Sequence, residues 1–276
     1  MLPNLIIIGA MKAGTTSLHY YLDLHPEISM SLPKELDFFV EDKNWQNGIT
    51  WYESHFTAQA KIHGESSVSY TTYPQAKNVV KRMYSLIPEA KLIYVLRDPI
   101  ERIISHYIHS YANSTEPEPF RRAIFEPYRE YLIRSRYYMQ LEQFLTYYPE
   151  PQILIITQED LWSKRQNTLQ KIFRFLDVDH TFCHPNFNKI LHGSNDKRRL
   201  NKIGELMLGS PAVKIIELLT NSRSGEIKKK IFRAYSRKIE RPFMDKSLRD
   251  ELVEYLKEDV DRLRKFTGHK FENWSI

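Results

Sequence analysis

The sequence contains very little cysteine and no long hydrophobic run. Its 276 residues include one cysteine, Cys183. A single thiol excludes an intrachain disulfide and a zinc site built on cysteines, and it is typical of a reducing compartment. No apolar stretch approaches the roughly 20 residues of a membrane-spanning helix. Because a strand-like apolar run already begins at Leu5, the sequence leaves no room for a signal peptide. We therefore expect a cytoplasmic protein without an integral membrane segment.

The sequence also lacks a strong charge imbalance. It has 40 lysines and arginines against 34 acidic residues, a net charge of +6. This excess suits anionic ligands but is too mild to predict nucleic-acid binding. Hydrophobic residues make up 42% of the chain and aromatic residues 13%, which excludes a disordered protein. The length predicts one domain over residues 1–276, and the sequence does not specify an oligomeric state.

Short β-branched runs alternate with helical patterns over the first 160 residues. The predicted strands are 5–8, 62–66, 91–96 and 152–157, and the predicted helices are 15–24, 74–86, 99–112 and 128–147. This alternation predicts an α/β fold with a P-loop-type parallel sheet flanked by helices. From residue 160 onward apolar residues recur mainly at helical spacing, which predicts a mostly helical carboxyl-terminal half with an irregular segment at 180–199.

The stretch 227–241 is basic and amphipathic. We interpret it as a solvated helix whose apolar side packs on the core. A helix that binds a membrane surface or a partner is the alternative.

The most informative segment is G-A-M-K-A-G-T-T-S, from Gly9 to Ser17, which lies between a predicted strand and a predicted helix. In this order the loop amides and the positive end of the helix converge on an anion. The glycine spacing fits an ATP-binding P-loop, but Thr15 follows Gly14 where such a loop has lysine. The lysine is instead Lys12, inside the loop. The segment predicts a phosphate site but disfavours an ordinary nucleoside triphosphate; a plain turn with a solvated lysine is the alternative.

A second anion site is predicted after strand 91–96. Asp98 is a natural helix N-cap and Pro99 a natural first helical residue. Arg97 then lies at the carboxyl end of a parallel strand, where open α/β sheets bind ligands. Ser105 follows two turns later. An arginine and a hydroxyl on rigid elements predict a phosphate site, with a structural salt bridge of Arg97 as the alternative.

Two phosphate sites, together with a lysine displaced from its usual P-loop position, match a nucleotide that is phosphorylated at both ends of its ribose. Here the sequence resembles the sulfotransferases that use 3′-phosphoadenosine 5′-phosphosulfate (PAPS), and within them the carbohydrate branch typified by heparan sulfate N- and O-sulfotransferases and their bacterial relatives. The shared motifs are specific in their order and spacing: G-A-M-K-A-G-T-T-S-L, P-K-E-L-D-F-F (33–39), G-E-S-S-V-S-Y (64–70), R-D-P-x-x-R-x-x-S-x-Y (97–107), Q-E-D-L (158–161) and F-T-G-H-K-F-E-N-W.

The resemblance implies PAPS as co-substrate, adenosine 3′,5′-bisphosphate (PAP) as product, and no metal. The residues implied at the 5′-phosphosulfate are those of the first motif: Lys12, Ala13, Gly14, Thr15, Thr16 and Ser17. Arg97 and Ser105 are implied at the 3′-phosphate. The basic segment 192–199 falls where the family has a loop over the nucleotide, which implies contacts from Ser194, Lys197 and Arg198, with a solvated loop as the alternative.

The resemblance also implies catalytic roles for Lys12, Lys34 and Glu35. Sulfuryl transfer resembles phosphoryl transfer, so Lys12 is expected to neutralise charge on the leaving group. Glu35 matches the catalytic glutamate of heparan-type enzymes, and a half-buried carboxylate beside aromatic residues can act as the base. The segment E-S-S-V-S-Y-T (65–71) lacks the histidine base of cytosolic aryl and steroid sulfotransferases.

The expected acceptor is a hydroxyl or amine of a saccharide or a small molecule, with Glu65 and Tyr70 as candidates to line its pocket. The alternative function is a P-loop kinase or NTPase acting on a small substrate. That alternative requires a lysine directly after Gly14 and a magnesium-binding aspartate, and the sequence shows neither in its usual place.

Overall fold

The computed structural model describes residues 1–57, 59–125, 130–189, 197–208, 230 and 232–276. The contacts between residues divide the chain into two compact units. The first unit comprises Met1–Ile103, Ile124–His192 and Met244–Ile276, and the second comprises Ile104–Ala123 and Gly193–Phe243. The single domain expected from the length stays a prediction.

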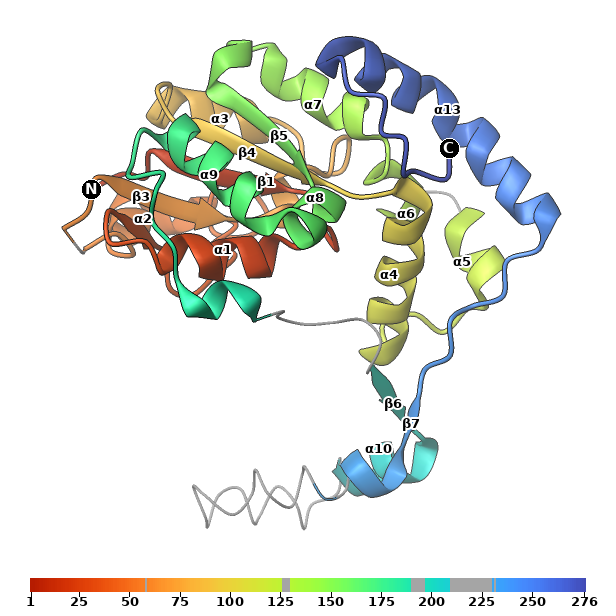
Figure 1. The fold of residues 1–276 in the computed structure, drawn as a ribbon. Coiled ribbons are helices and arrows are strands. Elements are labelled where there is room, and N and C mark those ends of the chain that lie inside the picture. The colour runs from red at the N-terminus through yellow and green to blue at the C-terminus, as the bar shows by residue number, and fades with distance from the viewer. Residues whose placement is uncertain (58, 126–129, 190–196, 209–229, 231) are drawn as a thin grey trace, which may run out of the picture. The chain divides into compact units, whose positions relative to one another are not determined.

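A five-stranded sheet forms the centre of the first unit (Figure 1). Its order is β2 (Ile28–Met30), β3 (Ile62–Ser66), β1 (Leu5–Gly9), β4 (Lys91–Leu96) and β5 (Ile153–Thr157), and every neighbouring pair is parallel. All of β1 and β3 is buried, as expected of parallel strands covered on both faces. The predicted α/β class is therefore confirmed.

Helices cover both faces of this sheet. In Figure 1, α1 (Thr15–Asp23) and α9 (Arg165–Leu176) lie on one side, and α3 (Val79–Leu86) and α7 (Tyr137–Leu145) on the other. The remaining described helices are α2 (Gly48–Glu53), α4 (Pro99–Ala112), α5 (Phe120–Phe125), α6 (Glu130–Ile133), α8 (Gln158–Ser163), α10 (Lys202–Leu208) and α13 (Lys246–Thr267).

The element boundaries predicted from the sequence agree best with the structure where an element is buried and its apolar residues are regularly spaced. The predicted strands 62–66 and 91–96 and the helix 99–112 match β3, β4 and α4. Strand β2, only three residues long, was missed. The predicted helix 74–86 begins only at Val79, because Asn78 adopts a left-handed conformation with φ 60°.

The second unit contains a two-stranded antiparallel ribbon, β6 (Arg198–Leu200) and β7 (Ser236–Lys238). The prediction of a continuous helix over 227–241 is wrong at β7; residues 227–229 and 231 lie outside the described part. The Arg198 guanidinium donates to the Ser236 side chain at 2.9 Å and to its carbonyl at 2.8 Å. These tertiary contacts and the ladder bonds stabilise an extended segment despite its helical pattern.

The predicted helix 128–147 is interrupted, and residues 128 and 129 are outside the described part. Helix α6 ends at Ile133 and α7 begins at Tyr137. Between them, Ser135 accepts a hydrogen bond from Nε of the fully buried Arg102 at 2.6 Å. A buried guanidinium must be hydrogen-bonded, and this requirement explains the break.

The amino terminus of α7 is capped by Asp259 of α13. Its two carboxylate oxygens accept the main-chain N–H groups of Tyr138 and Met139, both at 2.9 Å. No local side chain caps α7. The Asp259 side chain is buried, and this burial raises its pKa, opposed by the two amide hydrogen bonds. Asp259 therefore connects α13 to the sheet-covering helix α7.

We expect Asp259→Ala to lower the free energy of unfolding by about 1–3 kcal/mol, because two partly buried N–H groups lose their acceptor. The measurement is urea denaturation followed by circular dichroism. The control is Glu258→Ala, an exposed neighbour on α13, which should change stability by no more than about 0.5 kcal/mol. Equal effects of the two substitutions would contradict the capping role.

Candidate active site

The loop between β1 and α1 has the backbone shape of an anion-binding site. Lys12 and Gly14 adopt left-handed conformations, with φ 71° and 95°. Gly14 is the N-cap residue of α1, and no side chain caps the helix there. The first amides of α1 therefore keep their capacity to bind an anion, strengthened by the positive end of the helix.

Most side chains of this motif are turned into the protein. Ala13, Thr15 and Ser17 are buried, whereas Lys12 and Thr16 are partly exposed. Ser17 hydrogen-bonds with Tyr21 inside the first unit. Ala13, Gly14 and Thr15 can therefore reach a ligand chiefly through their main-chain amides.

Gly9 allows the segment after β3 to approach the end of β1. A Cβ at Gly9 would lie 2.4 Å from Oγ1 of Thr71, and its φ of 151° disfavours other residues. The Thr71 hydroxyl donates to the carbonyl of Ile8 at 3.2 Å. Glycine at this position thus reflects close packing at the base of the loop.

Arg97 lies beside the loop between β1 and α1. One of its terminal nitrogens donates to the main-chain carbonyl of Lys12 at 3.2 Å, and the other is 3.7 Å from the Glu101 carboxylate. Burial lowers the pKa of Arg97, and the charge of Glu101 opposes this shift. The two predicted anion sites therefore meet at Arg97 and Lys12. Ser105 is buried on α4 and belongs to the second unit, so its pairing with Arg97 stays a prediction.

Three segments far apart in the sequence meet at Asp98, next to Arg97. Its Oδ1 accepts the main-chain N–H of Glu101 at 3.0 Å, which confirms the predicted N-cap. Its Oδ2 accepts the N–H of Ser275 at 2.5 Å, and its own N–H donates to Glu159 at 2.9 Å. The Q-E-D-L segment and the carboxyl-terminal segment thus hold the β4–α4 junction.

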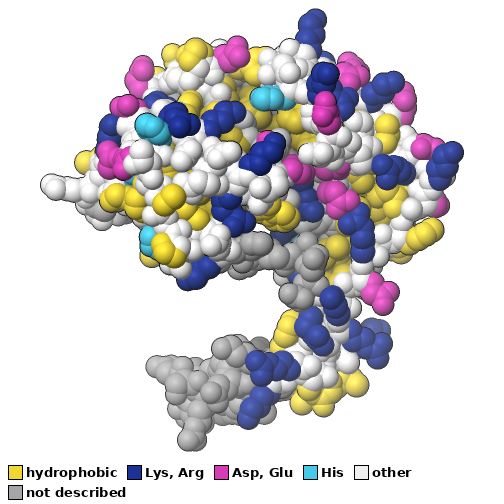
Figure 2. Space-filling model, viewed as in Figure 1, with side chains coloured by type: hydrophobic (Ala, Val, Ile, Leu, Met, Phe, Trp, Pro, Cys, Tyr) yellow, Lys and Arg dark blue, Asp and Glu magenta, His cyan; other side chains and the backbone are white. Residues whose placement is uncertain are grey.

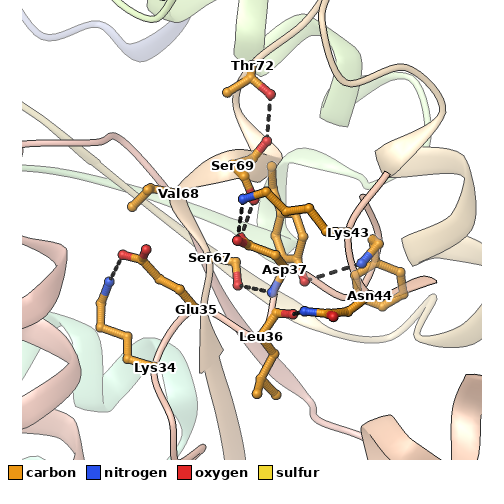
Figure 3. Close-up of polar contacts among 12 residues, drawn as sticks. Lys34, Glu35, Leu36, Asp37, Lys43, Asn44, Ser67, Val68, Ser69 and Thr72 are labelled. Carbon is orange, nitrogen blue, oxygen red and sulfur yellow. Dashed lines mark hydrogen bonds and ion pairs between the residues drawn. The ribbon is translucent and has the colours of Figure 1, made fainter. Parts of the chain in front are cut away.

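Glu35 is fixed at the end of β3. Its main-chain N–H donates to the carbonyl of Ser66 at 3.0 Å, and its φ is 67°. The Lys34 ammonium lies 2.5 Å from Oε1 of Glu35 (Figure 3). The Glu35 side chain is 44% exposed and that of Lys34 16%. The structure thus pairs these two predicted catalytic residues and leaves the carboxylate accessible to an acceptor.

The loop that carries Glu35 is held by Asp37, two residues further along. Figure 3 shows the Asp37 carboxylate accepting hydrogen bonds from Ser69 and Lys43. Its main-chain N–H donates to the Ser67 hydroxyl at 2.9 Å. These contacts restrain the loop and thereby the position of Glu35.

Glu65 lies beneath this loop and is fully buried. Its carboxylate accepts hydrogen bonds from the hydroxyls of Tyr52, Ser67 and Tyr70. Burial raises the pKa of Glu65 to about 7, and the three hydroxyls oppose the shift. The expectation that Glu65 lines an acceptor pocket is therefore wrong: its partners hold it in the interior, and through Ser67 it supports Asp37.

His19, which no sequence motif singled out, reaches the end of β3 from α1. Its Nδ1 lies 2.9 Å from the hydroxyl of Ser66. Burial, together with the charge of Lys34, lowers the pKa of His19 to about 4, so the imidazole is neutral at pH 7. The stretch after β3 contains no histidine, but the helical spacing of α1 brings one there from another part of the chain.

Arg134 was also missed, because it lies within a stretch interpreted as regular helix. One terminal nitrogen donates to the carbonyl of Val68 at 3.3 Å, and the other lies 2.7 Å from Glu130. Burial lowers the pKa of Arg134, and the charges of Glu130, Asp37 and Glu35 oppose this shift. Arg134 therefore places a positive charge near the loop that carries the candidate base.

The predicted nucleotide-covering segment is only partly described. Ser194 lies outside the described residues. Lys197 contacts Nδ1 of His109, and Arg198 binds Ser236, all within the second unit. The nucleotide contacts of these residues stay predictions.

Comparisons with known proteins agree with the fold and the motifs. The family model described as the sulfotransferase domain matches residues 2–270, so the chain belongs to the sulfotransferase family. The family recognised from the sequence, and the sulfotransferase class of enzyme, are thereby confirmed.

Among curated relatives, the human bifunctional heparan sulfate N-deacetylase/N-sulfotransferase 2 is 28% identical over 215 residues, which cover 71% of this chain and 24% of the relative. The membrane-associated sulfotransferase kil1 of Dictyostelium discoideum is 41% identical over 108 residues, which cover 38% of this chain and 22% of the relative. The chain thus matches about a quarter of the length of these relatives. A solved sulfotransferase from Alicyclobacillus acidocaldarius shares the fold, with a TM-score of 0.71, 22% identity and full coverage of both chains.

Among the described residues, no group of three or more histidine, cysteine, aspartate or glutamate side chains is arranged to hold a metal ion. No helix in the described ranges has both the length and the apolar character needed to cross a membrane.

The raised pKa of Glu65 predicts a pH-dependent stability. Between its ordinary value of 4.5 and about 7, the folded protein keeps a proton that the unfolded chain has released. The contribution of Glu65 to stability is therefore full below pH 4.5 and is lost as pH rises to about 7. Glu65→Gln cannot titrate, so the stability of the wild type relative to this variant should fall across that window and level off above it.

Denaturation midpoints from pH 4.5 to 8 test this expectation. The control Glu258→Gln, at an exposed position, should keep the wild-type pH profile. Parallel profiles for the wild type and Glu65→Gln would show that Glu65 does not titrate in this range.

Proposed function

We propose that the chain transfers the sulfuryl group of PAPS to a hydroxyl or amine of a saccharide acceptor. The observation that carries the proposal is the contact between Arg97 and the carbonyl of Lys12, at 3.2 Å. It brings an arginine at the end of β4 against the glycine-containing loop after β1. Two adjacent anion sites suit a nucleotide that carries phosphate at both its 5′ and 3′ positions.

The loop amides from Lys12 to Thr16 bind the 5′-phosphosulfate, and Arg97 with Ser105 binds the 3′-phosphate. The Lys12 ammonium neutralises the charge that develops on the leaving 5′-phosphate oxygen. Such preorganised positive groups stabilise the transition state more than the ground state. Ser194, Lys197 and Arg198 complete the nucleotide site in this proposal.

Glu35 accepts the proton of the acceptor hydroxyl or amine as the acceptor atom bonds to sulfur. The bond between sulfur and the 5′-phosphate oxygen breaks, and its electron pair leaves with PAP. Lys34, 2.5 Å from Glu35, holds the carboxylate in place and balances its charge. The restrained loop around Asp37 keeps this pair oriented.

A saccharide acceptor is supported by the human relative, whose name assigns it heparan sulfate N-sulfotransferase activity. A small-molecule acceptor is the second possibility for the same site. The kinase or NTPase alternative is disfavoured by the family match and by Thr15 in the position of the P-loop lysine. The cytoplasmic location is also a proposal, consistent with the exposed free thiol of Cys183.

Glu35→Gln should lower kcat by about 10²–10⁴-fold, because the base is lost while charge and shape change little. The affinity for PAP should stay within a factor of about three, a change below 1 kcal/mol. The assay follows transfer of labelled sulfate from PAPS to a panel of saccharide and small-molecule acceptors. The control, Asp42→Asn, lies exposed on the same loop and should keep wild-type turnover. Full activity of Glu35→Gln would eliminate Glu35 as the base.

Arg97→Ala should weaken PAP binding by about 10–150-fold, the equivalent of losing a charge-assisted interaction of roughly 1.5–3 kcal/mol. AMP lacks the 3′-phosphate, so its affinity should change much less. Calorimetric titration of both nucleotides measures the difference, with the exposed Arg174→Ala as control. An equal loss for PAP and AMP would show that Arg97 does not recognise the 3′-phosphate.

A further inference from the structure

The positive charge of this protein is concentrated in one segment of the second unit. Residues 193–243 contain 13 lysines and arginines against 5 acidic residues. The rest of the chain has 27 basic and 29 acidic residues, so this segment alone accounts for the net positive charge. Figure 2 shows the dark-blue side chains gathered around β6 and β7. The family motifs do not explain this concentration.

Within the second unit, a cleft of about 650 Å³ lies between the end of α4 and the β6–β7 ribbon. This volume is in the range of ligand pockets, roughly 300–1,000 Å³. One acidic side chain, Glu240, contributes to its wall. The aromatic and basic residues that line it are Tyr107, Tyr111, Arg199, Lys202, Arg237 and Lys238.

Two arginines face each other across this ribbon. Arg199 of β6 and Arg237 of β7 are direct register partners, so their side chains project from the same face. Like charges in directly opposed positions destabilise a β-ladder. In the described part of the chain, neither arginine forms an ion pair with a carboxylate. A bound polyanion would relieve this repulsion.

Arg199 is held in position by aromatic rings. Its guanidinium carbon lies 4.2 Å from the centroid of the Tyr111 ring. The Tyr111 ring is stacked on Tyr107, with centroids 5.7 Å apart and planes at 21°. The Tyr107 hydroxyl donates to the carbonyl of Glu118 at 3.0 Å, which anchors the stack. A guanidinium over a ring keeps its in-plane N–H groups available for bidentate binding of an oxyanion.

We infer that this cleft binds a multiply anionic oligosaccharide, an already sulfated or carboxylated stretch of the acceptor chain. The inference rests on the proposed function and narrows its acceptor to an acidic glycan. Two arginines with Lys202 and Lys238 suit anionic groups repeated along a chain. Arg199 and Tyr107 already engage the Tyr111 ring, which disfavours the base stacking of a single-stranded nucleic acid. The concave wall disfavours a flat bilayer surface.

The test is calorimetric titration of a heparin-derived hexasaccharide into the full chain saturated with PAP. The double variant Arg199→Gln/Arg237→Gln should bind the hexasaccharide at least tenfold more weakly than the wild type. The control Lys230→Gln/Arg233→Gln removes the same charge from exposed positions of the same unit, and it should change affinity less than threefold. Lys202→Gln/Lys238→Gln, which leaves the cross-strand arginines intact, should give an intermediate loss.

Equal losses in the arginine and control variants would overturn the inference, because general charge and not the cleft would then govern binding. It would also be overturned if the arginine pair affected a single-stranded DNA 12-mer or anionic phospholipid vesicles more than the hexasaccharide. PAP affinity is measured for the same proteins. Absence of PAP binding counts against the proposed nucleotide site, whereas normal PAP binding without hexasaccharide binding counts against the cleft alone.

Discussion

The pairing of β1 with β4 brings the two predicted anion sites to the same edge of the sheet. The main-chain N–H of Ala10 donates to the carbonyl of Val95 at 2.7 Å, so pairing continues past the end of β1. The loop after β1 and the arginine after β4 therefore emerge at the same edge of the sheet. Without this register Arg97 would not reach the carbonyl of Lys12, and the two predicted anion sites would not adjoin.

Three carboxylates of the first unit, those of Asp98, Asp37 and Glu65, hold the segments that carry the candidate site residues in place. Asp98 connects the β4–α4 junction to the carboxyl-terminal segment, and Asp37 restrains the loop that carries the candidate residues Lys34 and Glu35. Buried Glu65 supports that loop from below through Ser67. Each of these carboxylates loses hydration, and hydrogen bonds replace it. The result is a restrained loop that carries the partly exposed carboxylate of Glu35.

The two units of the protein differ in net charge. The first unit contains the candidate transfer residues and has no excess of positive charge. The segment 193–243 carries the basic excess and the aromatic residues that hold Arg199. In the proposed function, the first unit supplies the transfer site and the second unit binds the charges already present on an acidic acceptor.

The sequence by itself determined the parallel sheet, the anion-binding loop, the Asp98 cap and the family, because strand runs, glycine spacing and capping residues are local signals. Only the tertiary structure placed His19 beside Ser66, capped α7 with Asp259 and buried Glu65 under three hydroxyls. It also turned part of a helical pattern into β7, opposite Arg198–Leu200. These features depend on contacts between residues far apart in the chain, and local periodicity carries no information about which distant partner a polar side chain will meet.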